Sequence, residues 1–357
     1  MKTIYGLPKK VLICKKCLIS NQRPSSSPEF KKKNKKIPSV GFSLDGICDA
    51  CKYFEYKRSI NWQKREDELI KLCNKFRKNN GDYDVLVPGS GGKDSIFVSH
   101  ILKKKYGMNP LTVTWSPHIY TDIGWKNLQN WIKSGFDNVL VTPNYQVHSK
   151  LTRLAFKNLV NPFQPFIIGQ RNIGPKIAMK YGIKFIMYGE NQAEAHNKFN
   201  ENLSSKMDIS HFSSNDYKKI YLSGLSVNEL IKHNIKYADL KLYFPLLKKE
   251  VIKSKIEVHY MSYFVNWSPQ ANYYYAKEHA NFESNPDRSE GTYTKFSSLD
   301  DKIDGQHYYT MYIKFGQGRT MNDANRDIRD GFITRSEGIK LVKNMMENFQ
   351  KNILKKF

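Results

Sequence analysis

The chain has no long apolar run and no leader of the exported kind. No stretch approaches the roughly 20 apolar residues that a membrane-spanning helix needs, and the first residues do not place an apolar segment after a charged one. We therefore expect no membrane partner and a cytoplasmic location. A chain of 357 residues can bury a full α/β core together with smaller appended modules.

Cysteine is scarce, and its positions are uneven. Only five cysteines occur, and none follows Cys73. Cys14 and Cys17 form one C-x-x-C pair and Cys48 and Cys51 form another, a spacing that lets each turn present two thiolates to one tetrahedral ion. Without an export signal, disulfides are the weaker reading, so the sequence predicts a structural Zn²⁺ site. Cys73 falls on the apolar face of a predicted helix and should pack as a small hydrophobe.

Arginine is also scarce, although the chain is strongly basic. Of the 58 basic residues 11 are arginine and 47 are lysine, against 33 acidic residues, which gives a net charge of +25. Clustered positive charge would favour a nucleic-acid partner, but the lysines are spread along the whole chain apart from the run at 31–36. We interpret the excess as solvated lysine faces and expect no nucleic-acid partner.

Three regions are expected: a zinc-binding module with four cysteine ligands at 1–60, an ATP-binding α/β domain at 61–200 and a mainly helical substrate-binding region at 201–357. Residues 62–78 predict a helix that leads into the second region. Strand and helix patterns then alternate, which predicts a mainly parallel twisted sheet with flanking helices. The expected strands are Tyr83–Val87, Leu111–Trp115, Val139–Thr142 and Lys184–Tyr188, and the expected helices are Asp94–Tyr106, Trp125–Lys133, Gln146–Leu159 and Asn172–Tyr181.

A glycine-rich segment closes the first expected strand and opens the next helix. In a parallel sheet this is where backbone N–H groups and a helix N-terminus meet phosphate. The dinucleotide fingerprint requires glycine where Asp94 stands, and the Walker loop requires serine or threonine directly after Lys93. Neither motif fits the sequence Ser90-Gly91-Gly92-Lys93-Asp94-Ser95.

This segment resembles the pyrophosphate loop of the PP-loop ATP pyrophosphatases, which cleave ATP between its α and β phosphates and form an adenylated carbonyl. The resemblance implies ATP and Mg²⁺ as cofactors, with Asp94 helping to hold the metal and Lys93 adding charge. It also implies that Thr114 and Trp115, at the end of the second strand, contact adenosine. The residues implied to cradle the pyrophosphate are Ser90, Gly91, Gly92 and Ser95, and those implied to handle metal or ammonia are Glu190 and Asn191.

A closer resemblance runs over almost the whole chain and is to the N-acetyl sugar amidotransferases of bacterial surface-polysaccharide and flagellar-glycan pathways. It rests on the paired cysteines, Val87–Ser95, Tyr188–Asn191, Arg288–Lys302 and Lys314–Arg319. It implies a nucleotide-linked (UDP- or CMP-) N-acetyl sugar as substrate, an acetamidino product and a separate glutaminase subunit that supplies ammonia. Within the third segment it implies roles for Glu290 with metal or ammonium, for Arg288 and Lys295 with phosphate, and for Asp300 and Asp301 with metal or a sugar hydroxyl.

Two alternatives remain at this stage. One is a PP-loop enzyme that modifies transfer RNA, either a thiolase or a lysidine-type ligase; the absence of cysteine after Cys73 removes the usual sulfur carrier but does not affect ligation. The other is a non-catalytic zinc-ribbon scaffold with a vestigial loop. Retained RNA would favour the first alternative, and the absence of ATP-dependent AMP release would favour the second.

Overall fold

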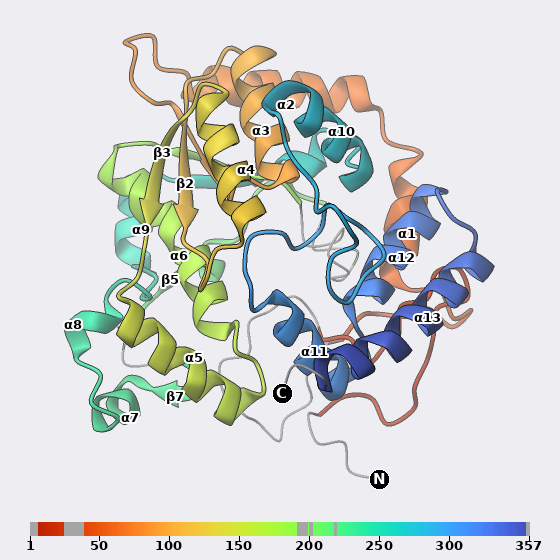
Figure 1. The fold of residues 1–357 in the computed structure, drawn as a ribbon. Helices are drawn as coiled ribbons and strands as arrows, with labels where there is room; N and C mark the ends of the chain where they lie inside the picture. The colour runs from red at the N-terminus through yellow and green to blue at the C-terminus, as the bar shows by residue number, and fades with distance from the viewer. Residues whose placement is uncertain (1–5, 25–38, 191–198, 200–202, 218–219, 355–357) are drawn as a thin grey trace.

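A parallel sheet forms the centre of the fold, as the alternating pattern predicts. The computed structural model describes residues 6–24, 39–190, 199, 203–217 and 220–354. Within them, five strands lie in the order β3-β2-β1-β4-β9, all parallel. Figure 1 shows β3 and β2 side by side. The strands are β1 (Val85–Pro88), β2 (Pro110–Trp115), β3 (Asp137–Val141), β4 (Phe185–Tyr188) and β9 (Glu257–Tyr260).

Helices cover both faces of this sheet and enclose two apolar cores. One core is formed beneath α2 (Trp62–Phe76), α3 (Lys93–Lys104), α4 (Asp122–Lys133) and α10 (Pro269–Ala280). The other lies beneath α5 (Tyr145–Leu159) and α6 (Gln164–Lys180). Because helices cover both faces, the central strands are apolar on both sides, and Val85, Leu86 and Val87 in β1 are all buried.

The structure corrects two details of the expected elements. The helix α6 begins at Gln164 instead of Asn172, because Pro165 stands in its first turn, where proline's missing N–H costs no hydrogen bond. The strand β9 was not expected, since residues beyond about 200 were predicted to be mostly helical. It pairs with β4 and brings α10, which follows it, against α3.

Short elements fill the chain between β4 and β9, and longer helices form the C-terminal region. The short elements are the 3-10 helix η2 (Ile209–His211), β5 (Ser213–Ser214), β6 (Tyr221–Leu222), β7 (Leu225–Ser226), α7 (Val227–Lys232), α8 (Tyr237–Leu240), β8 (Leu246–Leu247) and α9 (Lys248–Ser254). After β9 come the 3-10 helix η4 (Met261–Tyr263) and α10, followed by α11 (Asp304–Phe315), α12 (Arg319–Asp330) and α13 (Arg335–Leu354). No helix in the described ranges combines the length and the apolar character needed to cross a bilayer.

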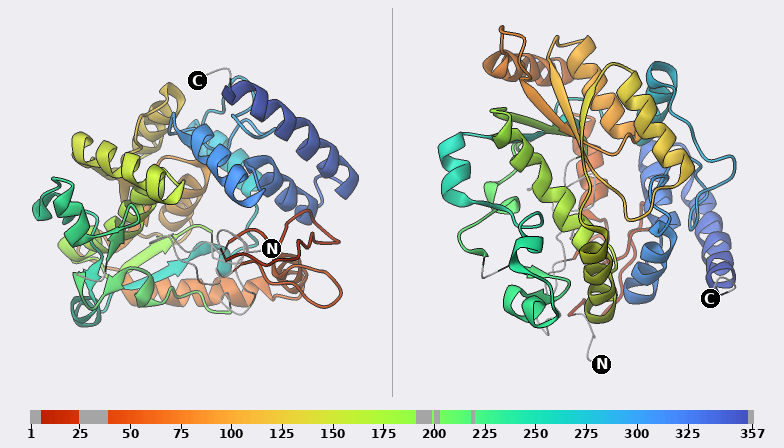
Figure 2. Two further views of the ribbon diagram at one scale, coloured as in Figure 1. Left: turned by 90° about the horizontal axis from the view of Figure 1, so that it is seen from below. Right: turned by 60° about the vertical axis from the view of Figure 1, so that its left-hand side comes forward.

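The N-terminal segment with the paired cysteines packs against the C-terminal helices. It includes α1 (Asp49–Lys57), and Figure 2 shows it beside the blue helices of the chain's other end. The backbone N–H of Leu18 donates to Asn325 Oδ1 at 2.7 Å, and Gln317 Nε2 donates to the Ser20 carbonyl at 3.0 Å. The division into three regions at residues 60 and 200 stays a prediction, and the central sheet extends beyond residue 200 through β9.

Candidate active site

The glycine loop joins β1 to α3 at the carboxyl edge of the sheet. Gly91 has φ +81°, and a Cβ placed on it would lie 2.7 Å from the Leu128 Cα. A Cβ on Gly89 would lie 2.2 Å from that of Ser95. Both positions therefore require glycine. The helix α3 starts directly after Gly92, so the unpaired N–H groups of its first turn point at the loop, as in a phosphate-binding helix N-terminus.

Asp94 in this loop is held by two partners. Lys93 Nζ donates to Asp94 Oδ2 at 2.6 Å, and Asn272 Nδ2, from α10, donates to Oδ1 at 2.9 Å. Burial would raise the pKa of the Asp94 carboxyl, but the charge of Lys93, these two hydrogen bonds and the more distant Arg326 hold it below its ordinary value. Asp94 is thus a carboxylate at neutral pH, and its side chain remains 41% exposed.

A cavity of about 180 Å³ opens over the loop. Residues 90–94 form one wall, and residues 296–300 with Arg319 form much of the facing wall. Lys93 and Arg319 thus lie in one cavity with the carboxyls of Asp94 and Asp300. Burial raises the pKa of Asp300, and the nearby Ser90 hydroxyl offsets this only in part. The cavity combines cationic groups suited to phosphate with carboxylate oxygens suited to Mg²⁺.

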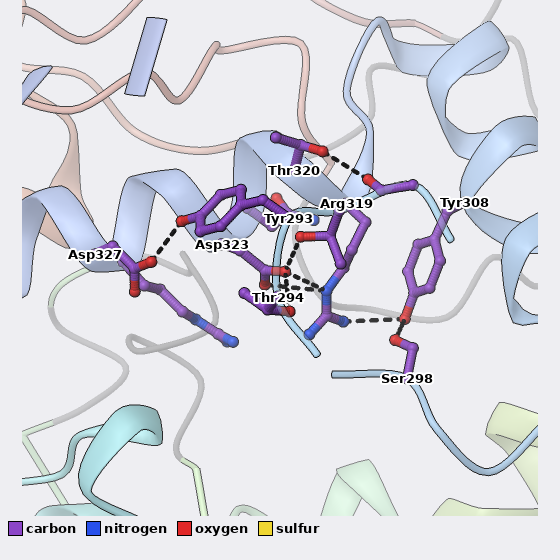
Figure 3. A network of polar contacts seen from close by, with 12 residues as sticks. Tyr293, Thr294, Ser298, Tyr308, Arg319, Thr320, Asp323 and Asp327 are labelled. Carbon is purple, nitrogen blue, oxygen red and sulfur yellow. Dashed lines mark hydrogen bonds and ion pairs between the residues drawn. The ribbon is translucent and has the colours of Figure 1, made fainter. Parts of the chain in front are cut away.

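Arg319 is held in this cavity by a hydrogen-bonded network (Figure 3). Its Nε donates to both carboxylate oxygens of Asp323, at 3.0 and 3.2 Å, and its Nη1 donates to the Tyr308 hydroxyl at 3.0 Å. Thr292 Oγ1 donates to Asp323 Oδ2 at 2.6 Å and fixes that carboxylate in turn. Burial alone would lower the pKa of Arg319, but Asp323 and Tyr308 raise it above its ordinary value. The guanidinium is therefore a fixed positive charge.

Two more carboxyls lie behind the cavity wall. Asp301 is buried and accepts hydrogen bonds from the backbone N–H and the Nδ1 of His118, both at 2.7 Å. Asp304 is buried at the start of α11, and burial together with the carboxyls of Asp300 and Asp301 raises its pKa to about 8. Asp304 therefore carries a proton at neutral pH, and the local negative charge is lower than three carboxyls would give.

A second cavity, of about 310 Å³, lies across the carboxyl ends of β1, β2, β4 and β9. Gly89 belongs to its lining, so it adjoins the glycine loop, and Trp115, Tyr188 and Tyr260 give it aromatic walls. A Cβ placed on Gly169 would lie only 2.2 Å from a carbon of the Trp115 ring, so the ring packs directly against the backbone of Gly169. Its buried Nε1 has no hydrogen-bond partner within the described part of the chain. An apolar cavity with aromatic walls beside a phosphate-type loop suits an adenine base.

The other predicted site residues fall into two groups. Ser95 Oγ donates to the Gly92 carbonyl at 2.9 Å and stabilises the loop from within. Thr114 is buried in β2, where its Oγ1 accepts from Asn138 at 3.1 Å, and Glu190 forms an ion pair with Arg326. Asn191 lies outside the described residues. The structure therefore places Ser95 and Thr114 as supports of the loop and the strand, while Glu190 reaches the C-terminal helix α12.

Three residues predicted in the segment 288–302 do not line the loop cavity. Arg288 Nη1 donates to the Thr292 carbonyl at 3.5 Å, and Lys295 Nζ donates to the Pro286 carbonyl at 2.7 Å. Glu290 is exposed, and its carboxylate lies over Gly305 at the start of α11. These contacts hold the segment together, whereas the cavity wall is supplied by residues 296–300. The roles given to the three side chains stay predictions.

The four cysteines of the N-terminal module converge, as their spacing predicts. Their Sγ atoms all lie within 4.8 Å of one another and are buried, with Cys17 to Cys48 at 3.6 Å and Cys14 to Cys51 at 3.8 Å. Thiolates about 2.3 Å from a tetrahedral Zn²⁺ are about 3.8 Å apart, so the arrangement fits a zinc ion. Such a site has four protein ligands and no open position, which makes its role structural.

The C-terminal region of the chain is similar to a known protein family. Residues 290–357 match the family described as "LPS biosynthesis protein WbpG-like, C-terminal domain". The matched residues include Arg319, Asp323, Tyr308 and the cavity wall up to Asp300. The part of the chain that resembles a lipopolysaccharide biosynthesis domain therefore forms the wall that faces the glycine loop.

Similarity to individual proteins is low or covers only part of the chain. An uncharacterised protein, MJ1599, of Methanocaldococcus jannaschii is 28% identical over 128 residues, which are 36% of this chain and 41% of the relative's length. Similar solved structures include an NH3-dependent NAD synthetase from Campylobacter jejuni (15% identity, 40% of this chain and 64% of that one, TM-score 0.30). Another is the U34-tRNA thiolase NcsA from Methanococcus maripaludis, which is 12% identical, with 91% of this chain and 89% of that one covered and a TM-score of 0.34. With TM-scores this low, we draw nothing about function from these two structures.

Two residues of the site were missed by the sequence reasoning. Arg319 lines the loop cavity, and its only signal was its place at the end of the segment Lys314–Arg319. Asn272 holds Asp94 from a helix that follows an unexpected strand, and nothing in its sequence context marks it. Both belong to elements that come to the loop only through the tertiary fold.

Proposed function

We propose that this protein is an ATP-dependent amidotransferase that converts the acetamido group of a nucleotide-linked N-acetyl sugar into an acetamidino group, with AMP and pyrophosphate as by-products. The observation that carries the proposal is the cavity shared by the glycine loop and Arg319. It combines a phosphate-type loop with a wall from the region that matches a lipopolysaccharide biosynthesis domain. That match supports a sugar of a surface polysaccharide as the acceptor.

The reaction proceeds in two steps. An amide carbonyl is a poor electrophile, so its oxygen first attacks the α-phosphorus of ATP, and pyrophosphate leaves as the bond between the α and β phosphates breaks. Ammonia then adds to the imidate carbon, which loses AMP together with the former carbonyl oxygen and loses protons to give the acetamidino group. A separate glutaminase subunit is the proposed ammonia source.

Residues of the loop cavity match the charges that develop in the first step. The N–H groups at the start of α3 and the side chains of Lys93 and Arg319 stabilise the departing pyrophosphate. Asp94 and Asp300 offer the oxygen ligands that Mg²⁺ prefers, and the ion would neutralise phosphate charge there. The aromatic cavity beside Gly89 takes the adenine base against the rings of Trp115, Tyr188 and Tyr260.

Modification of transfer RNA is the competing function within the same superfamily. Thiolation needs a cysteine or a cluster beside the activated carbonyl. All five cysteines are buried, four of them in the zinc-type site, and Cys73 packs in the core beneath α2, where burial raises its pKa to about 12. No thiol is therefore presented to either cavity. A lysidine-type ligation does not need one, and the assay below includes it.

The proposal is tested by incubating the protein with Mg-ATP, isotopically labelled ammonium and a panel of UDP- and CMP-linked N-acetyl sugars, followed by mass spectrometry. We expect labelled nitrogen to replace oxygen in one sugar, with AMP formed in equal amount. Parallel reactions contain transfer RNA with free lysine. Labelled product from no sugar in the panel would refute the proposal, and lysine-dependent AMP release with transfer RNA would establish the competing function.

A further inference from the structure

Arg171 lies between two cavities of the sheet's carboxyl edge. It projects from α6, and it belongs to the lining of the aromatic cavity of about 310 Å³ and of a neighbouring cavity of about 350 Å³. We call the latter the serine cavity, because Ser210, Ser213 and Ser214 line it. The two cavities meet at Arg171 and His211, the residues that they share.

The guanidinium of Arg171 has no anionic partner within the described residues, where it makes neither an ion pair nor a hydrogen bond. The ionisable groups closest to it are the hydroxyls of Tyr188 and Tyr260, and the side chain is half-buried. Burial lowers its pKa, which shows that the charge is partly removed from water. A half-buried guanidinium without a carboxylate costs stability, and a bound anion offsets that cost.

The serine cavity is rich in groups that bind hydroxyls. Ser213 Oγ donates to the Ile209 carbonyl at 2.7 Å. Ser214 Oγ donates to the Asp216 carbonyl at 3.0 Å and accepts from the Asp216 N–H at 3.2 Å, so each of the two oxygens keeps at least one lone pair for a ligand donor. Asn172 Nδ2 donates to the Tyr243 carbonyl at 2.8 Å, which orients its Oδ1 as a further acceptor. No carboxylate is among the described residues that line this cavity. The lining therefore suits an anionic ligand with several hydroxyl groups.

The two cavities also have an order relative to the glycine loop. Gly89 lines the aromatic cavity and does not line the serine cavity, which lies on the other side of Arg171. A ligand in the serine cavity can thus place a phosphate at Arg171, on the border of the aromatic cavity, while the phosphates of ATP occupy the loop. The acceptor then adjoins the cavity that holds the base of ATP, and transfer to its carbonyl requires this proximity.

We propose that Arg171 binds the phosphate of the sugar-nucleotide acceptor and that the serine cavity holds the hydroxyl-bearing part of the same molecule. This inference rests on the proposed function for the identity of the acceptor. The phosphates of ATP lie at the glycine loop, so the phosphates of the two substrates have separate cationic groups: Lys93 and Arg319 for ATP, and Arg171 for the acceptor.

The test measures binding without turnover. Affinities for UDP and for CMP are determined by calorimetry on the full chain, saturated with Mg²⁺ and a non-hydrolysable ATP analogue so that the loop is occupied. We expect Arg171→Gln to weaken the tighter of the two probes by about 10-fold or more, because a charged hydrogen bond contributes about 1.5–3 kcal/mol. Arg171→Lys should have an intermediate effect, and affinity for the ATP analogue should change less than about 2-fold. The matched control is Arg153→Gln, at an exposed arginine of α5.

A second variant covers the case in which Arg171→Gln does not fold. Ser210 is exposed at the rim of the serine cavity, so Ser210→Trp should fold, and its ring should obstruct the cavity and weaken the same probe. The inference is overturned if the wild type binds neither probe, if Arg171→Gln behaves like Arg153→Gln, or if it weakens the ATP analogue instead. If probe binding depends on Arg171 but no sugar is amidated, the site stands and the proposed function fails. If Arg171→Gln amidates a sugar with unchanged KM, the proposed function stands and the role given to Arg171 fails.

Discussion

Asn272 of α10 donates a hydrogen bond of 2.9 Å to the carboxylate of Asp94 in the glycine loop. The contact joins the loop to a helix that follows the fifth strand, so the position of the key carboxylate depends on the far end of the sheet. Lys93 holds the other oxygen of the same carboxylate at 2.6 Å. The loop is thus oriented from both sides before any nucleotide binds.

Asp94→Asn should reduce ATP-dependent AMP formation by at least about 100-fold, because the substitution removes a carboxylate placed to balance phosphate and metal charge. Zinc content and melting temperature should stay close to those of the wild type, since the side chain is 41% exposed. AMP release measured by chromatography checks the prediction. Asn272→Ala is the graded comparison, with a smaller loss expected, and near-normal AMP release in Asp94→Asn would contradict the role given to Asp94.

Arg319→Lys should lower kcat/KM for ATP by about 10- to 100-fold, although the positive charge is retained. A lysine ammonium cannot occupy both the position of Nε beside Asp323 and the position of Nη1 beside the Tyr308 hydroxyl, so the charge would lose its fixed position. Steady-state kinetics with varied ATP checks this. Arg335→Lys, at an exposed position on α13, serves as the matched control. Equal kinetics in the two variants would show that Arg319 does not act on ATP.

Cys48→Ser should abolish stoichiometric zinc binding and lower the free energy of unfolding by about 3 kcal/mol or more, because a structural zinc ion contributes folding energy directly. The module contacts α12 where Leu18 meets Asn325, and it contacts the turn before α12 where Ser20 meets Gln317, so activity should fall as well. Metal analysis and thermal unfolding provide the measurement. Cys73→Ala is the control, since Cys73 lies away from the cluster in the core beneath α2. Full zinc content in Cys48→Ser would rule out a four-cysteine site.

Asp304→Asn should make the protein more stable than the wild type above about pH 5, by a margin that grows up to pH 8. The pKa of Asp304 is raised to about 8, so the folded state retains a proton that the unfolded state loses, and wild-type stability from this group falls as pH rises through that interval. The slope is at most about 1.4 kcal/mol per pH unit. Chemical unfolding in metal-free buffer at several pH values measures it, and a constant difference between the two proteins would disprove the raised pKa.

The local parts of the site followed from the sequence because they depend on neighbours in the chain. The order strand, glycine loop and helix needs only alternating apolar patterns and the residue types at 89–95, and the cysteine spacing needs only one turn of chain for each pair. The structure confirmed the central sheet, the covering helices, the four-cysteine cluster and the helical C-terminal region.

Most of what faces the loop was decided by the tertiary structure. The strand β9 was not predicted from the sequence, yet its pairing with β4 brings Asn272 to Asp94. Arg171 resembles any other basic helix residue until the packing of η2 and β5 encloses it between two cavities without a carboxylate. Local patterns determine which elements form, because propensity and capping act over a few residues, whereas the partners of a charge depend on contacts that only packing of the whole chain creates.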